Sequence, residues 1–242
     1  MSQVVIRSLP VLSDNYAHFI HDPATGATAC IDPADDPAIL KALNDWDWNL
    51  TEILITHPHW DHVDGIKTLV KAFGAEVYGS RSDLGKIPSC DFGVLGGDGV
   101  KVGPLCASVI HVPGHTSHHV AYYFSEAGAL FCGDSLFSLG CGRLLGGTAA
   151  EMWSSLKRLS ALPEDTKIYC AHEYTQANGR FALHVDPDNA DLKIRMEEVN
   201  ELRAQGLPTV PSTLASELKC NPFLRCRDEQ EFTELRRLKD HF

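Results

Sequence analysis

The sequence predicts a mixed α/β body followed by a helical segment. Short apolar strands alternate with amphipathic helices along the first part of the 242-residue chain. Strand patterns stop after His172, and apolar positions then recur at helical spacing. Apolar residues make up 44% of the chain and charged residues 22%, which is enough apolar material for a packed core without disulfides.

Five apolar segments have the length and composition of strands. They are residues 28–31, 52–56, 120–124, 129–132 and 167–171. A turn at residues 125–128 joins the third and fourth of these segments, which predicts a β-hairpin.

Caps and apolar stripes predict the helices. Asp36-Pro37 offers an N-cap and a proline in the first turn of one helix. The stripe over residues 66–73 predicts a second helix that ends at Gly74. Thr148 and Glu151 match a capping box at the start of a third.

Two more helices are expected after His172. One has an apolar stripe within residues 192–202 and stops at Gly206, and the other covers residues 232–238. We therefore expect two domains, residues 1–172 and residues 173–242. No flexible linker separates them, so we expect them to pack tightly.

Charge and composition limit the classes of molecule that the protein is expected to bind. The formal charge is −11, since 21 Lys and Arg oppose 32 Asp and Glu. Such a field disfavours nucleic acid and anionic membranes, although a local basic patch can still bind a small anion. We expect neither a signal peptide nor a membrane span, because the first residues lack a charged stretch followed by a long apolar one and no apolar run reaches membrane-spanning length. We expect a cytoplasmic monomer whose eight cysteines are reduced.

The densest chemical signal follows the strand at residues 52–56. That strand runs directly into His57-Pro58-His59-Trp60-Asp61-His62. Imidazole nitrogens and carboxylate oxygens are the ligands that suit zinc, iron and manganese. Packing four titratable groups together without a metal would be unfavourable in a core. The loop is therefore predicted to bind metal.

Three further candidates share one property with this loop. His115 follows a strand-like segment, Asp134 ends the strand at residues 129–132, and His172 ends the strand at residues 167–171. Each alone is a weak signal. Together they occupy the carboxyl ends of strands, where an α/β scaffold usually places its site.

At this point the chain resembles a known family. The series His57-x-His59-x-Asp61-His62, then His115, Asp134 and His172, is similar to the ligand series of the metallo-β-lactamase superfamily. Longer stretches resemble the hydroxyacylglutathione hydrolases, or glyoxalases II, over almost the whole chain. These stretches are residues 133–137, 140–143, 171–175, 210–214 and 221–225.

The resemblance implies an αββα sandwich followed by a small α-helical C-terminal domain. It also implies two divalent metal ions, with zinc as first choice and iron or manganese as alternatives. By motif, His57, His59 and His115 would hold the first ion, and Asp61, His62 and His172 the second. Asp134 would bridge the ions beside a bridging hydroxide, which gives Asp61 and Asp134 catalytic roles.

The implied reaction is hydrolysis of the thioester of S-(2-hydroxyacyl)glutathione. With S-D-lactoylglutathione the products would be glutathione and D-lactate, the second step of methylglyoxal detoxification. By resemblance, Arg143 and Tyr174 would line the glutathione cleft, and Arg236 and Lys239 would bind the glycine carboxylate. One departure stands at residues 145–146, where Leu-Gly replaces the usual aromatic residue and glutamate.

Thioester chemistry suits such a site. A thiol has a pKa of about 8.5, so a thiolate leaves with little protonation, and the reaction needs only a nucleophile and an electrophilic clamp. The main alternative is a glutathione persulfide dioxygenase with a single iron, and another hydrolase of the superfamily is the next. A closed structural zinc site is a further alternative, but seven ligands with an internal carboxylate favour an open two-metal site.

Overall fold

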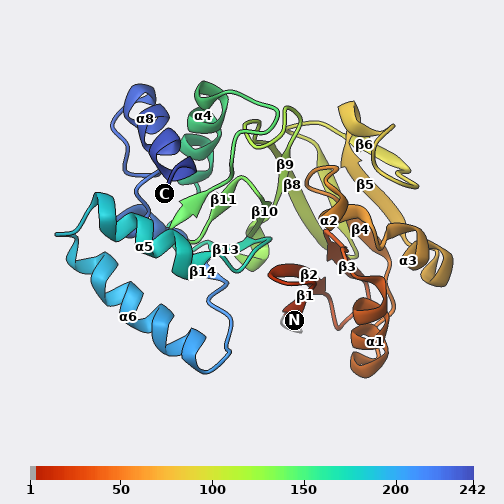
Figure 1. The fold of residues 1–242 in the computed structure, drawn as a ribbon. Coiled ribbons are helices and arrows are strands. Elements are labelled where there is room, and N and C mark those ends of the chain that lie inside the picture. Colours follow the sequence, from red (N-terminus) through yellow and green to blue (C-terminus); the bar gives the residue numbers. More distant parts are fainter. Residues whose placement is uncertain (1–3) are drawn as a thin grey trace. The chain divides into compact units, whose positions relative to one another are not determined.

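The computed structural model describes residues 4–242 and divides into two compact units (Figure 1). Unit 1 comprises the described residues up to 111 together with residues 118–133. Unit 2 comprises residues 112–117 and 134–242. The domain boundary expected after residue 172 stays a prediction.

Unit 1 contains a six-stranded sheet in the order β1-β2-β3-β4-β5-β6. The strands are β1 (Val5–Val11), β2 (Asn15–His21), β3 (Thr28–Ile31), β4 (Glu52–Leu54), β5 (Glu76–Ser80) and β6 (Phe92–Val94). The first three pair antiparallel, and β3 to β6 pair parallel. The parallel pairing places the carboxyl ends of β3 and β4 at one edge, where the predicted metal loop begins.

Three α-helices belong to unit 1: α1 (Asp36–Trp46), α2 (Trp60–Val63) and α3 (Ile66–Phe73). The N-cap of α1 is Asp35, whose side chain accepts a hydrogen bond from the Ala38 amide, and not Asp36 as expected. Asp35 is the N-cap because its backbone is extended, as an N-cap residue requires. The predicted stop of α3 at Gly74 is confirmed, with φ of 68°. Apolar faces of α1 and α3 join the core against the sheet.

A second group of strands in unit 1 is antiparallel throughout: β7 (Gly99–Val102), β8 (Leu105–His111), β9 (Val120–Phe124) and β10 (Ala129–Gly133). The predicted hairpin is confirmed, with Ala129 opposite Phe124 and the 3₁₀ turn Ser125–Ala127 between the strands. The Tyr122 hydroxyl donates to the Ile55 carbonyl at 3.0 Å, which ties this group to the six-stranded sheet. Unit 1 therefore has the layer order helix, sheet, sheet.

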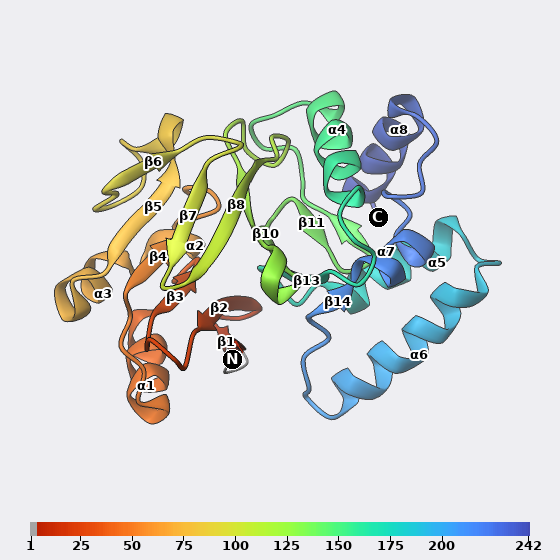
Figure 2. The same ribbon diagram turned by 180° about the vertical axis from the view of Figure 1, so that it is seen from behind.

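Unit 2 is mainly helical: α4 (Ala149–Ser160), α5 (Thr175–Val185), α6 (Ala190–Ala204), α7 (Leu214–Cys220) and α8 (Glu229–Asp240). The capping box of Thr148 and Glu151 at the start of α4 is confirmed. In both views α4 lies beside α8, and α5 beside α6 (Figures 1 and 2). The helical character expected after His172 is thus confirmed.

Four short strands complete unit 2. β11 (Leu136–Phe137) and β12 (Gly140–Cys141) form a hairpin, and β13 (Lys167–Cys170) pairs with β14 (Ser212–Thr213). β14 lies in the segment where the sequence predicted no strand; at two residues it is too short to leave a periodic pattern.

The described residues also bear on cysteines and membranes. All eight cysteines lie within them and have free thiols, and six of these are buried. Across residues 4–242, no helix has both the length and the apolar character needed to cross a bilayer.

Candidate metal and substrate site

Unit 1 carries four of the seven predicted ligands. His57 follows the end of β4, and Asp61 and His62 lie on the single turn of α2. His57 and His62 are fully buried, whereas His59 and Asp61 are partly exposed. The His57 Nε2 and His59 Nδ1 atoms are 2.9 Å apart, and His62 Nε2 lies 3.7 Å from an Asp61 oxygen. The structure thus gathers the ligand atoms of this loop.

Asp32 orients two of these histidines, a role that the sequence analysis missed. One Asp32 oxygen accepts from the Thr56 hydroxyl at 2.7 Å and from His62 Nδ1 at 3.0 Å. Because the Thr56 hydroxyl donates its one hydrogen to Asp32, its oxygen accepts a hydrogen bond from His57 Nδ1 at 3.0 Å. Both imidazoles therefore keep Nε2 unprotonated, as metal binding requires. The available signal was position, because Asp32 directly follows β3.

Asn15 fixes the carboxylate in the same loop. Its side-chain amide donates to the Asp61 Oδ2 atom and to the Asp61 backbone carbonyl, each at 3.1 Å. Asn15 opens β2 and lies 46 residues from its partner, so no sequence spacing pointed to it.

Unit 2 carries the other three predicted ligands. His115 Nε2 lies 3.4 Å from one oxygen of Asp134, and His172 Nε2 lies 3.4 Å from the other. His115 donates Nδ1–H to the Arg143 carbonyl at 2.8 Å. The His172 ring stacks on Tyr174 at 4.7 Å between centroids. Asp134 therefore presents one oxygen to each of two histidines, as a bridging carboxylate would.

This donor set fits a divalent cation. Two ligand atoms about 2.1 Å from a tetrahedral ion are about 3.4 Å apart. The two contacts at Asp134 have that separation. In the tautomer that donates only Nδ1–H, to the Arg143 carbonyl, His115 turns its Nε2 lone pair toward an Asp134 oxygen. A cation would convert that repulsion into coordination.

A cavity of about 340 Å³ in unit 2 adjoins His115 and Asp134. All four residues predicted to bind substrate line it: Arg143, Tyr174, Arg236 and Lys239. Cys141 also lines it, but burial raises the pKa of this thiol to about 11, so the thiol is protonated at neutral pH. A protonated thiol is a poor nucleophile, which leaves the histidine and carboxylate cluster as the reactive feature of this cavity.

The basic residues that line the cavity differ in the hydrogen bonds that they make to the protein. Arg236 is 4% exposed and donates to the Cys141 carbonyl at 2.9 Å and to Asp240 at 2.8 Å. Within the described residues, the Arg143 guanidinium and the Lys239 ammonium make no hydrogen bond to protein. Lys239 lies over the rings of Phe181 and Phe242 at 5.3 and 5.5 Å. Burial, followed by the charges of Arg236 and Arg180, lowers the pKa of Lys239.

Residues 145–146, where this chain differs from the family pattern, contact His115 through the backbone of Leu145. The Leu145 amide donates to the His115 carbonyl at 3.1 Å, and the Leu145 side chain is 56% exposed. The backbone at this position therefore contacts His115, while the Leu145 side chain offers no hydroxyl.

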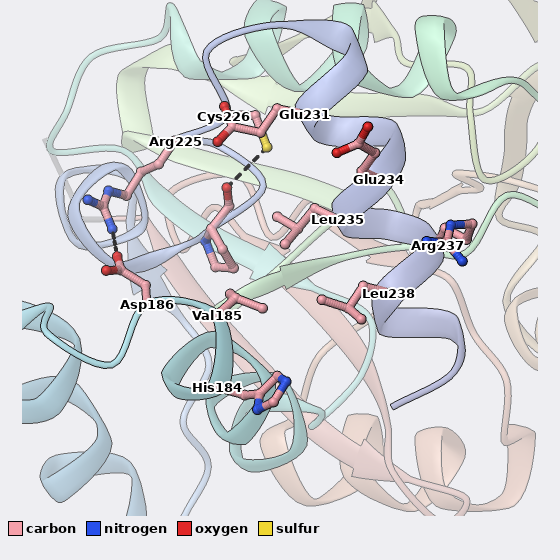
Figure 3. A pocket seen from close by; sticks show the side chains of 11 residues that line it. His184, Val185, Asp186, Arg225, Cys226, Glu231, Glu234, Leu235, Arg237 and Leu238 are labelled. Carbon is pink, nitrogen blue, oxygen red and sulfur yellow. Dashed lines mark hydrogen bonds and ion pairs between the residues drawn. The ribbon is translucent and has the colours of Figure 1, made fainter.

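A larger cavity, of about 890 Å³, lies on another face of α8 (Figure 3). Val185, Leu235 and Leu238 give it an apolar lining, and Asp186 pairs with Arg225 at one side (Figure 3). None of the predicted site residues lines it. Arg237 does, and this places it apart from Arg236 and Lys239 on the same helix.

Comparisons with known proteins define the class first. The family model described as "Metallo-beta-lactamase superfamily" matches residues 22–172. ETHE1 from Myxococcus xanthus is similar in structure, with a TM-score of 0.76, 26% identity and coverage of 96% of this chain and 90% of that one. TTHA1623, solved in a di-iron-bound form, matches with a TM-score of 0.65 and 26% identity over 91% of this chain and all of that one. The chain is a metallo-β-lactamase-fold enzyme, and the predicted fold class is confirmed.

The narrower family follows from the rest of the chain. The model described as "Hydroxyacylglutathione hydrolase C-terminus" matches residues 173–242. A hydroxyacylglutathione hydrolase of Maricaulis maris is 48% identical over the full length of both chains, and one of Jannaschia sp. is 51% identical over 93% of this chain and 88% of its own. The chain belongs to the hydroxyacylglutathione hydrolase family.

Proposed function

We propose that this enzyme hydrolyses the thioester of S-(2-hydroxyacyl)glutathione, with S-D-lactoylglutathione as its substrate, and releases glutathione and D-lactate. The observation that carries the proposal is the cavity of unit 2, where a carboxylate facing two histidines adjoins arginine and lysine side chains. Family membership over the whole chain supports the same reaction. This reaction would be the second step of methylglyoxal detoxification.

We further propose two divalent metal ions per chain, with zinc as the first choice. His57, His59 and His115 would hold one ion, Asp61, His62 and His172 the other, and Asp134 would bridge them. The superfamily match spans all seven residues, which supports this assignment. The di-iron form of TTHA1623 makes iron the first alternative, and manganese is the second.

The residues of the chain would then divide the work. Bound divalent cations supply hydroxide at neutral pH by lowering the pKa of water to about 7. Asp32 and the Arg143 carbonyl hold the histidine tautomers, and Asn15 holds the Asp61 carboxylate. Since a thiolate leaves unprotonated, no side chain has to act as a proton donor.

For the substrate, we propose that Lys239 binds the glycine carboxylate and that Arg143 and Tyr174 line the rest of the glutathione cleft. Lys239 is suited to this role because its ammonium is half-buried and free of hydrogen bonds among the described residues. Arg236 keeps its predicted part in carboxylate binding only if some of its donors turn from Cys141 and Asp240 toward the ligand. We also propose a monomer that acts in the cytoplasm.

Metal analysis paired with a thioester assay tests the function. We expect close to two transition-metal ions per chain and release of free thiol from S-D-lactoylglutathione. Replacing Asp134 by alanine should lower both metal content and turnover, because the bridging carboxylate is lost. Unchanged metal content and turnover in Asp134→Ala would remove the two-metal assignment.

Oxygen dependence distinguishes thioester hydrolysis from the main alternative reaction. A glutathione persulfide dioxygenase would consume oxygen and yield sulfite, whereas hydrolysis proceeds equally well under nitrogen. Equal thiol release with and without oxygen is the expected result. Oxygen-dependent turnover of glutathione persulfide, without thioester hydrolysis, would favour the dioxygenase.

A further inference from the structure

The short hairpin of β11 and β12 connects the residues of the candidate site in unit 2. It begins two residues after Asp134 and ends two residues before Arg143. The Arg143 carbonyl accepts a hydrogen bond from His115 Nδ1. On the hairpin itself, Phe137 packs against the rings of His172 and Tyr174, with centroids 5.9 and 5.3 Å apart. A shift of the hairpin would therefore move several of these groups together.

The hairpin cannot hold its position by its own hydrogen bonds. It has two residue pairs, and Leu139 in its turn has φ of 58°, a left-handed conformation that is unfavourable for a leucine. The segment is buried throughout, so its backbone N–H and C=O groups need partners from elsewhere in the protein.

Polar side chains of the helical segment supply those partners. Asn221 Nδ2 lies 3.1 Å from the Phe137 carbonyl and 2.9 Å from the Gly140 carbonyl, so one amide reaches both strands. Glu217 on α7 accepts from the Leu139 amide at 2.8 Å and from Asn221 at 3.0 Å.

Two more helices add one contact each. Asn178 on α5 donates to the Ser138 carbonyl at 3.1 Å, and Arg236 on α8 donates to the Cys141 carbonyl at 2.9 Å. Asn221 and Glu217 are fully buried, and the other two are at most 6% exposed. Asn221 and Glu217 are therefore shielded from solvent, whereas Asn178 and Arg236 adjoin the smaller cavity.

The packing leaves no slack between the hairpin and the site. A Cβ atom added at Gly142 would lie 2.0 Å from the Asp134 carbonyl oxygen and 3.2 Å from His115 Nδ1. One added at Gly140 would lie 2.5 Å from the Asn178 amide. At these distances a displacement of the hairpin reaches Asp134 and His115 directly.

We propose that Asn221, supported by Glu217, is a positioning residue: it holds the β11–β12 hairpin, and through it the geometry of Asp134 and His115. The inference rests on the proposed function for its catalytic consequence, but its structural consequence is independent of the substrate. It gives the helical segment a second role besides its proposed part in glutathione binding, namely holding Asp134 and His115, two of the seven predicted metal ligands, in place.

The test is Asn221→Asp, which keeps the oxygen that accepts from the Phe223 amide and removes the two donors. The matched control is Asn189→Asp in the same helical segment. Asn189 also donates to a backbone carbonyl, that of Lys219, and to Asp186, and its oxygen caps α6; among the described residues none of these hydrogen bonds reaches the hairpin. Both variants replace an amide donor by a carboxyl group, at a fully buried position in Asn221→Asp and at a partly buried one in Asn189→Asp.

Three readouts are compared at equal distance below each variant's melting temperature. In Asn221→Asp we expect exchange of the amide hydrogens of residues 136–143 to speed up at least tenfold, metal affinity by chelator competition to fall roughly 10–100-fold, and kcat to fall more than KM changes. Asn189→Asp should leave all three near the parent values. Local exchange and metal affinity unchanged in a folded Asn221→Asp would overturn the proposal, as would faster exchange spread evenly over unit 2.

If Asn221→Asp does not fold, Asn178→Ala replaces it, because this variant removes only the bond to Ser138 and should show the same signature at smaller size. Unchanged exchange at residues 136–143 in Asn178→Ala would then count against the proposal. If the parent enzyme does not hydrolyse acyl-glutathiones, the proposed function fails. Exchange and metal affinity still decide whether Asn221 positions the hairpin.

Discussion

At the scale of single residues, the Asp32 side chain orients two of the predicted metal ligands. Its carboxylate orients His62 directly and His57 through Thr56, and it also accepts from the Thr56 amide at 2.8 Å. Partners that orient metal ligands usually contribute about 10–100-fold in metal affinity. Asp32 therefore belongs with the predicted ligands in importance although it offers no ligand atom.

Asp32→Ala should lower the affinity for metal by about 10–100-fold, measured by chelator competition. Asp22→Ala is the control. Asp22 is also a buried carboxylate that follows a strand, but it binds the turn at Thr25, at the opposite end of the sheet. Equal losses in the two variants would mean that Asp32 supports unit 1 in general and not the histidines.

Two basic residues of α8, Lys239 and Arg237, are expected to differ in their effect on catalysis. Lys239→Ala should lower kcat/KM for glutathione thioesters by about 10- to 150-fold, mainly through KM, because a partly desolvated charged hydrogen bond is worth about 1.5–3 kcal/mol. Arg237→Ala should be near the parent, since Arg237 lines the other cavity (Figure 3). A thioester without the glycine carboxylate should be hydrolysed equally by all three proteins, and an equal loss on that substrate would refute carboxylate binding by Lys239.

The lowered pKa of Lys239 predicts how substrate binding depends on pH. Binding of a carboxylate needs the charged ammonium, which is present below the pKa of Lys239 and is lost as pH rises through it. Because burial lowers this pKa, KM should rise at a lower alkaline pH than an ordinary lysine would give. Lys239→Arg keeps its charge, so the rise should disappear in initial rates corrected for spontaneous hydrolysis. A rise that persists in Lys239→Arg must come from another group.

At the scale of elements, strand ends and one hairpin build the site. β3 and β4 are parallel neighbours, so residues that follow them meet at one edge, which is how Asp32 reaches Thr56 and His62. In unit 2 the hairpin takes the corresponding role with the help of α5, α7 and α8. Short elements that make few hydrogen bonds of their own depend on helices distant in sequence.

Gly142→Ala tests how tightly the end of this hairpin is packed. The added methyl group would meet the Asp134 backbone at 2.0 Å, so the backbone must shift, and we expect a marked loss of metal content and turnover. Gly85→Ala is the control, because a Cβ there meets nothing within 4 Å and its φ is not left-handed. Full metal content in Gly142→Ala, measured by elemental analysis, would show that the packing yields.

At the scale of the whole molecule, bound metal should contribute to folding stability. An ion present at 100 times its dissociation constant stabilises the native state by about 2.7 kcal/mol. For a chain of this size that corresponds to a rise in melting temperature of roughly 5–10 °C. Removing metal with a chelator should lower Tm by that amount in the parent and by clearly less in Asp134→Ala. An identical drop in both would mean that Asp134 is not needed to hold the metal.

The local chemistry of this protein was open to prediction from its sequence. Strands β3 and β9 have the expected bounds, and the capping box at α4 and the stop at Gly74 are confirmed, because each depends on neighbours within one turn or one strand. The ligand types were equally accessible, since four of them occupy six consecutive positions. The family matches confirm the fold class and the enzyme class that these motifs indicated.

What only the tertiary structure decided are contacts between residues far apart in the chain. His62 and Asp32 are 30 residues apart, Asn221 and the Phe137 carbonyl 84, and Arg236 and the Cys141 carbonyl 95. The family resemblance assigned Arg236 to the glycine carboxylate, yet its guanidinium is buried on carbonyls that no sequence pattern connects to it. The physical reason is that burial obliges every backbone polar group to find a partner, and which side chain is within reach depends on the packing of elements, not on their spacing in sequence.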